Sequence, residues 1–194
     1  MKQWYTITGI NELYLSRKWF ITHRSMFCDN DDCCLFLGGD LSDLDIKKIK
    51  SDISLLRNTG TYIVTEKVKQ VLEAYCKEDC EFHRINDSEL YYLEVKTVAE
   101  VHEEYHQFSS RFGTLNPCPQ CGRHYSIIIG KALDFKNEQW HYLNIEKNYE
   151  TNLCRSPIKL GDSLYASYMI FISEQVIQAL KNAGCKGFYF WRCV

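Results

Sequence analysis

The chain has 194 residues, of which 45% are hydrophobic and 25% charged, with 25 acidic side chains against 23 lysines and arginines. This balance is typical of a globular protein with one domain or two small ones, and it excludes disordered and collagen-like chains. The chain also lacks the basic excess of a dedicated nucleic-acid-binding protein, so nucleic acid is an unlikely partner.

In chain order, the first half is predicted to contain two strands, a helix and a strand–helix–strand unit. The strands are 4–10 and 13–22, the helix is 42–56, and the unit begins at Tyr62. In that unit the run Tyr62–Val64 predicts a buried strand, and Thr65 is placed to cap the helix that follows. The apolar residues of this helix recur at helical spacing. They are Val68, Val71, Leu72 and Tyr75.

The second half is predicted to contain strands at 89–95, 126–129 and 140–145, a loop over 148–162, and then a second unit of the same kind. In this unit Ile170–Ile172 is the strand, Ser173 the helix cap and Gly184 the residue that ends the helix. A closing strand follows in both units. It carries Phe82 in the first unit and Phe190 in the second.

The two units match when the sequence is shifted by 108 residues. Without a gap, 6 of the 24 pairs that start at Tyr62 and Ile170 are identical, and they include Arg84 with Arg192. Such self-similarity indicates an internal duplication. We therefore predict an α+β fold with two duplicated halves, 1–88 and 89–194, joined at Asn86–Ser88, with a zinc-ribbon-like knuckle between them.

Ten cysteines make up about 5% of the chain, fewer than a small disulfide scaffold carries. No apolar run is long enough to span a membrane, and the first residues lack a secretory signal. We therefore expect a cytoplasmic protein with reduced thiols, some of which bind metal and others of which pack in the core. Five cysteines without metal-type spacing are predicted to be core residues. They are Cys76, Cys80, Cys154, Cys185 and Cys193.

Cys118-Pro-Gln-Cys121-Gly is the most informative short motif. The C-x-x-C spacing lets two thiolates face one metal ion, and a closed tetrahedral zinc site needs two more ligands. Cys28 and Cys33 form a C-x₄-C pair at a similar place in the first half. We predict that Cys28, Cys33, Cys118 and Cys121 bind one structural Zn²⁺, with Cys34 and His23 as alternative ligands.

A second motif, His102-Glu-Glu-Tyr-His106, matches H-E-x-x-H. On a helix its two histidines would share one face, with Glu103 as the general base of a zinc hydrolase. No third ligand follows at the usual spacing. We therefore interpret this segment as a polar face and predict no catalytic residues, so that the hydrolase is only a second alternative function.

Several segments together resemble the bacterial double-CXXCG-motif proteins. Thr22-His23 precedes the first cysteine group, and Asp40-Leu-Ser follows it. Cys118–Arg123 matches the second motif of the family, and the segments around Phe171–Glu174 and Phe188–Phe190 resemble its terminal strand–helix–strand. The first CXXCG is not present as such, because Cys28, Cys33 and Cys34 stand there with longer spacing.

Proteins of this family are immunity proteins that neutralise a cognate polymorphic toxin. The resemblance implies a non-enzymatic cytoplasmic protein whose partner is that toxin. Three acidic segments, Asp29–Asp32, Asp40–Asp45 and Glu100–Glu104, are candidates to face a basic toxin. The alternative is a zinc-ribbon module that binds nucleic acid or regulates transcription, which the knuckle favours and the net charge of −2 opposes.

Overall fold

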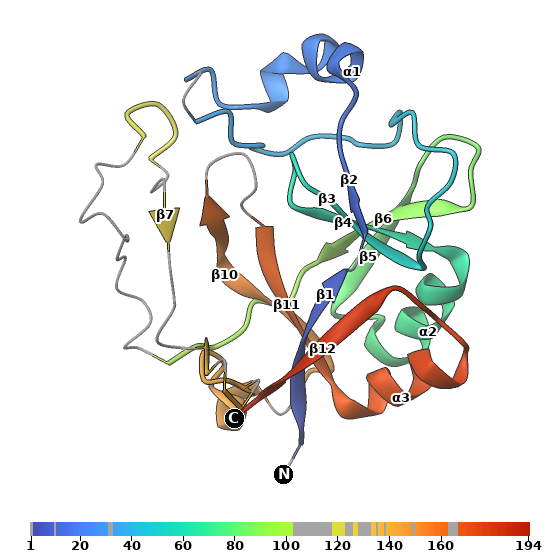
Figure 1. The fold of residues 1–194 in the computed structure, drawn as a ribbon, viewed down its shortest axis with the longest axis vertical. Coiled ribbons are helices and arrows are strands. Elements are labelled where there is room, and N and C mark those ends of the chain that lie inside the picture. The colour runs from blue at the N-terminus through green and yellow to red at the C-terminus, as the bar shows by residue number, and fades with distance from the viewer. Residues whose placement is uncertain are drawn as a thin grey trace.

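The structure is a computed structural model that describes residues 2–9, 11–30, 33–102, 118–122, 126–127, 133–134, 136–137, 139–148, 150–162 and 167–194. Within these ranges the fold is α+β, as expected, with helices and two sheets (Figure 1). The helices are α1 (Arg17–Thr22), α2 (Glu66–Cys76) and α3 (Glu174–Asn182), with short 3₁₀ turns at Arg24–Met26 and Ile145–Asn148.

The first sheet has the order β2-β3-β4-β6-β5. Its strands are β2 (Asn11–Leu13), β3 (Ile53–Leu56), β4 (Thr61–Thr65), β5 (Cys80–Arg84) and β6 (Leu90–Val95). Only β2 and β3 pair in parallel, and the other neighbours are antiparallel. Helix α2 connects β4 to β5 and packs on this sheet, as the strand–helix–strand prediction requires.

The second sheet has the order β7-β10-β11-β1-β12-β9-β8. Its strands are β1 (Trp4–Gly9), β7 (Ser126–Ile127), β8 (Leu133–Asp134), β9 (Gln139–Trp140), β10 (Leu153–Asp162), β11 (Ser167–Ser173) and β12 (Phe188–Cys193). The N-terminal strand β1 thus lies in the middle of a sheet whose other strands all come from beyond residue 125 (Figure 1).

The two sheets share a register. Thr65 of β4 pairs with Leu90 of β6, and the matching Ser173 of β11 pairs with Trp4 of β1. A shift of 108 residues places β4 on β11 and β5 on β12, and the partner strands then follow in register. Leu55 pairs with Tyr62 as Arg155 pairs with Ile170, and Phe82 pairs with Leu93 as Phe190 pairs with Ile7. Therefore β1 occupies in the second sheet the place that β6 occupies in the first.

Helices α2 and α3 lie side by side and cover one core between the sheets (Figure 1). This core combines Val68 and Leu72 of α2 with Val176 and Leu180 of α3, all buried. Burial of these apolar side chains supplies the main stabilisation of the packing between the two helices and the sheets. The predicted division between residues 88 and 89 falls in the turn between β5 and β6, which pair along their length.

The helix boundaries agree with the sequence, but the capping contacts differ. Thr65 and Ser173 are the N-cap residues, yet neither side chain caps its helix. The Thr65 hydroxyl contacts Asp52 Oδ1 and the Ser173 hydroxyl contacts Asn152 Oδ1, both at 3.0 Å. Gly184 follows α3 with φ of +69°, the left-handed conformation that glycine adopts readily after a helix.

Two elements predicted in the first half are wrong. The strand predicted at 13–22 is mostly helix α1, because Ser16 accepts a hydrogen bond from the Trp19 N–H and Trp19 is buried. The helix predicted at 42–56 is irregular chain followed by β3. Asn86 binds the carbonyl oxygens of Ser42 and Leu44, each at 2.6 Å, so this chain is held by tertiary contacts.

Two predictions in the second half are also wrong. The strand predicted at 140–145 is limited to its first residue, which belongs to β9. The loop predicted over 148–162 contains the long strand β10. Pro157 lies at a register shift between Arg155 and Lys159, where its missing N–H breaks no regular pair. Of the strand predicted at 126–129, only 126–127 lie within the described residues, and these form β7.

Candidate metal centre

Cys28 and Cys33 lie on a short hairpin. Phe27 and Phe36 form an isolated antiparallel bridge, and the Cys28 N–H donates to the Leu35 carbonyl at 2.8 Å. Beyond this bridge the chain turns back, and the Cys33 N–H donates to the Asn30 carbonyl at 2.9 Å. The hairpin therefore brings the two thiols to one side of the loop despite their four-residue spacer.

Cys118 and Cys121 lie on a tight turn. The Gly122 N–H donates to the Cys118 carbonyl at 2.8 Å, and Gly122 has φ of +71°. A glycine adopts this conformation with little strain, which explains its place directly after the second cysteine. The turn thus presents both thiols toward the first hairpin.

The four predicted cysteines come together. The Sγ atoms of Cys28 and Cys118 are 3.7 Å apart, and those of Cys33 and Cys121 are 3.6 Å apart. All four sulfur atoms lie within 4.8 Å of one another. A tetrahedral ion with metal–sulfur bonds of ~2.3 Å requires sulfur–sulfur distances of roughly 3.8 Å. The donor set of four thiols is therefore compatible with a metal site.

The cluster is shielded from solvent. Cys28, Cys33 and Cys118 are buried and Cys121 is partly buried, with Leu35 packed against them. Burial raises the pKa of Cys28 and raises the pKa of Cys33 to about 12, because a thiolate loses its hydration there. Hydrogen bonds from the backbone of Asn30 and Leu35 lower these two pKa values in part. A bound cation would stabilise the thiolates further.

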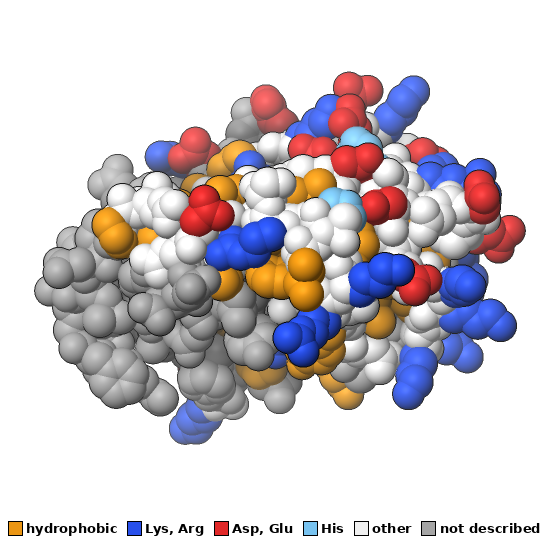
Figure 2. Space-filling view, turned by 90° about the horizontal axis from the view of Figure 1, so that it is seen from above, with side chains coloured by type: hydrophobic (Ala, Val, Ile, Leu, Met, Phe, Trp, Pro, Cys, Tyr) orange, Lys and Arg blue, Asp and Glu red, His pale blue; other side chains and the backbone are white. Residues whose placement is uncertain are grey.

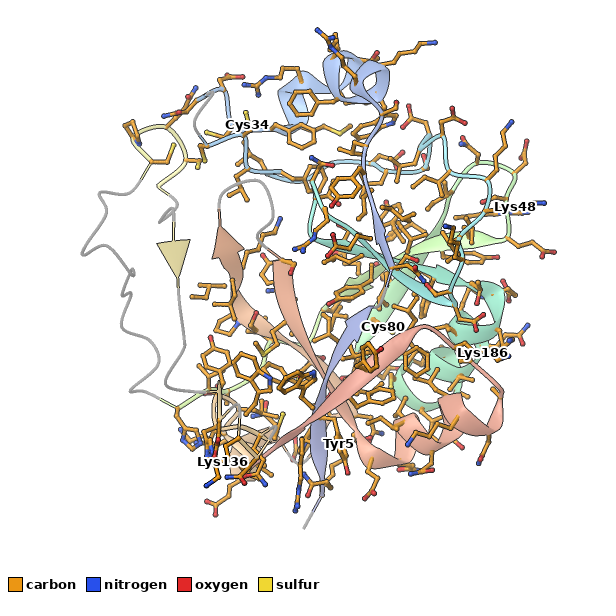
Figure 3. All side chains as sticks on the ribbon, viewed as in Figure 1. Tyr5, Cys34, Lys48, Cys80, Lys136 and Lys186 are labelled. Carbon is orange, nitrogen blue, oxygen red and sulfur yellow. The ribbon has the colours of Figure 1, made fainter. Side chains whose placement is uncertain are left out.

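The alternative ligands lie elsewhere. Cys34 is on the same stretch of chain (Figure 3), with φ of +41°, but it does not belong to the group of four. The His23 ring stacks on Trp19 with centroids 4.1 Å apart, and its Nε2 lies 3.0 Å from an Asp43 carboxylate oxygen. Cys33 is thus the first-half partner of Cys28.

Polar contacts join the two cysteine turns outside the thiol cluster. Arg24 donates to the carbonyl of Cys28 at 2.8 Å and lies 3.7 Å from the Asp29 carboxylate. The Gln120 amide donates to the same carboxylate at 3.4 Å. These contacts connect segments about 90 residues apart in sequence and orient the thiol-bearing backbone.

The remaining cysteines pack in the core, as predicted. Cys76, Cys80 and Cys185 belong to the cluster between the sheets, and Cys154 and Cys193 to a second cluster on the other face of the larger sheet. Burial raises the pKa of each of these thiols, and that of Cys80 and Cys193 rises to about 12. They are neutral packing residues at physiological pH.

Most of the H-E-x-x-H motif lies outside the described residues, including Glu103 and His106. His102 is described, and its N–H donates to the Tyr142 carbonyl at 3.1 Å. The preceding residues Val98 and Val101 form bridges to Arg155 and Leu143. The segment that leads into the motif is therefore extended rather than helical.

A second group of possible ligands was not predicted. Glu81, His83 and Glu94 gather on paired strands β5 and β6, with His83 Nε2 3.1 Å from a Glu94 carboxylate oxygen. Glu81 binds Lys96, and the His83 ring stacks on Tyr92. These contacts explain the group as an exposed ion-pair network. Only strand register, which the sequence leaves open, brings the three side chains together.

Comparison with protein-family models gave no match, and comparison with curated protein sequences gave none either. None of the helices in the described part of the chain has the length and apolar character needed to cross a membrane.

Proposed function

We propose that the protein is an immunity protein that binds and neutralises a cognate bacterial toxin in the cytoplasm, without catalysis of its own. We further propose that Cys28, Cys33, Cys118 and Cys121 bind one structural Zn²⁺. The observation that carries this proposal is the buried thiol cluster, because it joins the two cysteine groups on which the resemblance to double-CXXCG immunity proteins rests.

In this proposal the chain is an internal duplication whose halves have exchanged their first strands. The common register supports it, since β1 and β6 take equivalent places in the two sheets. The order along the chain is also the same in both halves. Each half has a first strand, then its cysteine pair, and later two strands, a helix and a closing strand. The first half adds β2 and α1 before its cysteine pair, and the second adds the short strands β7, β8 and β9 after it. A zinc ion held by both cysteine pairs would then lie between the halves and fix them together.

Such a clamp suits a protein that acts by binding. A rigid surface loses little conformational entropy when a partner binds, and more of the contact energy remains as affinity. Four thiolates around zinc supply this rigidity at the end of the molecule that holds the cysteine turns (Figure 1). Catalysis by zinc would instead need an open coordination position, and four cysteine ligands leave none.

The test is to express the gene encoded next to this protein in bacteria, alone and together with the protein. We expect the neighbouring product to be toxic alone, the cells to survive on co-expression, and a stable complex to be purified from them. A harmless neighbouring product, or cell death despite soluble protein, would contradict the immunity function. Glu103→Gln should protect as well as the original chain, since the proposal assigns it no chemistry.

The alternative is a zinc-ribbon module that binds nucleic acid. Figure 2 shows acidic and basic side chains interspersed over the face seen from above, rather than one basic stripe. Phosphate-dominated binding requires clustered lysine and arginine. Retention on a heparin column and a shift of oligonucleotide mobility would favour the alternative, and their absence together with toxin binding favours immunity.

A further inference from the structure

A cleft of about 830 Å³ lies between the two sheets, beside the metal centre. One wall comes from β4 and β6 of the smaller sheet, and the opposite wall comes from β10 and β11 of the larger sheet. The loop that follows Cys33 and the glycine that follows Cys121 complete its rim. Both halves of the chain and both cysteine turns therefore contribute to one cleft.

Two cationic side chains flank one aromatic ring in this cleft. The Arg155 guanidinium carbon lies 4.2 Å from the centroid of the Tyr168 ring, and Lys159 Nζ lies 5.5 Å from it. Stacking on an aromatic face orients a guanidinium group and leaves its N–H edge available for a planar anion. The ring of Phe36 also lies 5.4 Å from Lys159 Nζ.

Backbone carbonyl oxygens bind both of these cations. Arg155 donates to the carbonyl oxygens of Val95 at 3.0 Å and Ser156 at 3.2 Å. Lys159 donates to those of Phe36 at 3.1 Å and Thr59 at 3.2 Å. Among the described residues, no carboxylate forms an ion pair with Arg155. Its charge is thus fixed in place but not neutralised, which favours an anionic ligand.

The internal repeat supplies a comparison for this position. Arg155 pairs with Ile170 in the larger sheet, and Leu55 pairs with the matching Tyr62 in the smaller sheet. Leu55 packs against the core between the sheets. The second half therefore carries an arginine where the first half carries an apolar side chain that serves the fold. Packing alone does not require the charge, which indicates a binding role.

The surroundings suit a segment of another protein. Tyr92 and Tyr168 line the cleft, and Leu37 at its rim is 57% exposed. Arginine and tyrosine beside exposed apolar side chains are the residue types that carry most of the energy in protein interfaces. Figure 2 shows hydrophobic side chains gathered between lysines and arginines on one face of the molecule.

Three described carboxylates of the first two acidic segments considered above are less suited to this role. Asp29 contacts Arg24 and Gln120, and Asp40 accepts hydrogen bonds from the Ser42 N–H and hydroxyl. Asp43 accepts from the Trp19 ring N–H at 2.8 Å. These carboxylates hold the fold of their own loops, whereas Arg155 has no such carboxylate partner among the described residues.

We propose that this cleft binds an acidic segment of the partner protein, with a carboxylate paired to Arg155 and apolar side chains against Tyr168 and Leu37. The inference rests on the proposed function, and it assigns the toxin-binding face to the junction of the two halves. The carboxylate would pair with the Nη1–Nη2 end of Arg155, because Nε and one N–H of Nη1 already donate to the carbonyl oxygens of Val95 and Ser156. Two parallel charge-assisted hydrogen bonds at that end would also fix the direction of the bound segment.

The experiment measures fluorescence anisotropy of a labelled Glu-Tyr-Glu-Tyr-Glu peptide with the full-length protein. Saturable binding is expected, together with much weaker binding of the matched Gln-Tyr-Gln-Tyr-Gln peptide. Arg155→Leu, which installs the residue of the equivalent position, should weaken binding about tenfold or more, as expected for the loss of one charge-assisted contact. Arg192→Leu changes the net charge equally but lies outside the cleft, and it should leave binding unchanged.

Equal binding of both peptides, or an equal effect of the two arginine variants, would overturn the assignment. So would displacement of the peptide by inorganic phosphate at an equal concentration, since this would indicate a site for small anions. Thermal unfolding of Arg155→Leu must match the original chain, and Arg155→Lys provides a second variant that keeps the charge but loses the fork.

The two proposals fail in different ways. If cells survive the toxin but the peptide does not bind and Arg155→Leu protects fully, only the cleft assignment is wrong. If the peptide binds with the expected dependence on Arg155 but co-expression does not protect cells, the immunity function is wrong and the cleft remains a site for acidic segments.

Discussion

The Sγ atoms of Cys28 and Cys118 lie 3.7 Å apart although 90 residues separate them in the chain. Each belongs to a cysteine pair that stands between the first strand and the strand–helix–strand unit of its half. The four thiols thereby bring together two segments that are distant in the sequence. This relationship leads to the first of four predictions.

We predict that the purified protein contains one zinc ion per chain and that Cys118→Ser with Cys121→Ser abolishes it. Loss of the ion should lower the free energy of unfolding by on the order of 4 kcal/mol or more, because the metal is bound by the folded chain only. Metal analysis and thermal unfolding measure both effects. Cys34→Ser is the matched control and should retain the metal. If the original protein contains no zinc, the proposed metal site is wrong.

A second prediction concerns Gly187, which has φ of +92° between α3 and β12. A Cβ atom at this position would lie 1.9 Å from the Cβ of Ser51, so Gly187→Ala forces the chain apart. We expect a loss of about 2–4 kcal/mol in chemical denaturation. Gly184→Ala, with φ of +69° and open space around the added atom, should cost only about 1 kcal/mol. Equal losses would contradict the close approach to Ser51.

The third prediction tests the position of β1. Trp4 is fully buried in the middle of the larger sheet. Trp4→Ala should lower the free energy of unfolding by about 3–5 kcal/mol, through lost apolar burial and the resulting cavity. Tyr189 lies in the neighbouring strand β12 but is 60% exposed. Tyr189→Ala should therefore change the free energy of unfolding by about 0.5 kcal/mol or less. Similar values for both variants would place β1 outside the sheet.

The fourth prediction is a loss of stability at high pH. Burial raises the pKa of Tyr62 to about 12, whereas an unfolded tyrosine titrates near 10. Between these values the unfolded chain loses the proton first, so stability present below pH ~10 falls as the pH rises toward ~12. The contribution of this residue is on the order of 2–3 kcal/mol.

Tyr62→Phe isolates this effect, because the hydroxyl makes only a long contact of 3.5 Å to the Ile7 carbonyl. The variant should unfold like the original chain at neutral pH and lose less stability above pH ~10. Other buried groups, such as Tyr142, also titrate in this range, so the difference between the two proteins is the measurement. If the difference in the free energy of unfolding between the two proteins is the same at neutral and alkaline pH, the burial of the hydroxyl is contradicted.

The sequence predicted the elements that have strong local patterns. The strands and helices from Tyr62 to Phe82 and from Ile170 to Phe190 follow from β-branched runs and helical spacing, and Gly184 marks a helix end. It failed where tertiary contacts decide the conformation. The chain from Ser42 to Asp52 has apolar residues at near-helical spacing, yet Asn86 binds its carbonyl groups and keeps it irregular.

The four cysteines were chosen from spacing alone, and the structure brings them together. The structure favours Cys33 over Cys34 as the partner of Cys28, because the group of four thiols includes Cys33 and not Cys34. The cleft and Arg155 were not predicted. Arg155 occupies the position in the larger sheet that Leu55 occupies in the smaller one, which could have singled it out. This equivalence is visible only from the strand registers, not from the sequence.

By itself the sequence determined the similarity of the two strand–helix–strand units, their helices and the residues able to bind a metal, since these depend on local pattern and spacing. Only the tertiary structure decided that β1 joins the far sheet, that four thiols meet, and that Arg155 faces a cleft. The physical reason is that strand partners and contacts between distant segments are selected by burial of the whole core, which no short stretch of residues specifies.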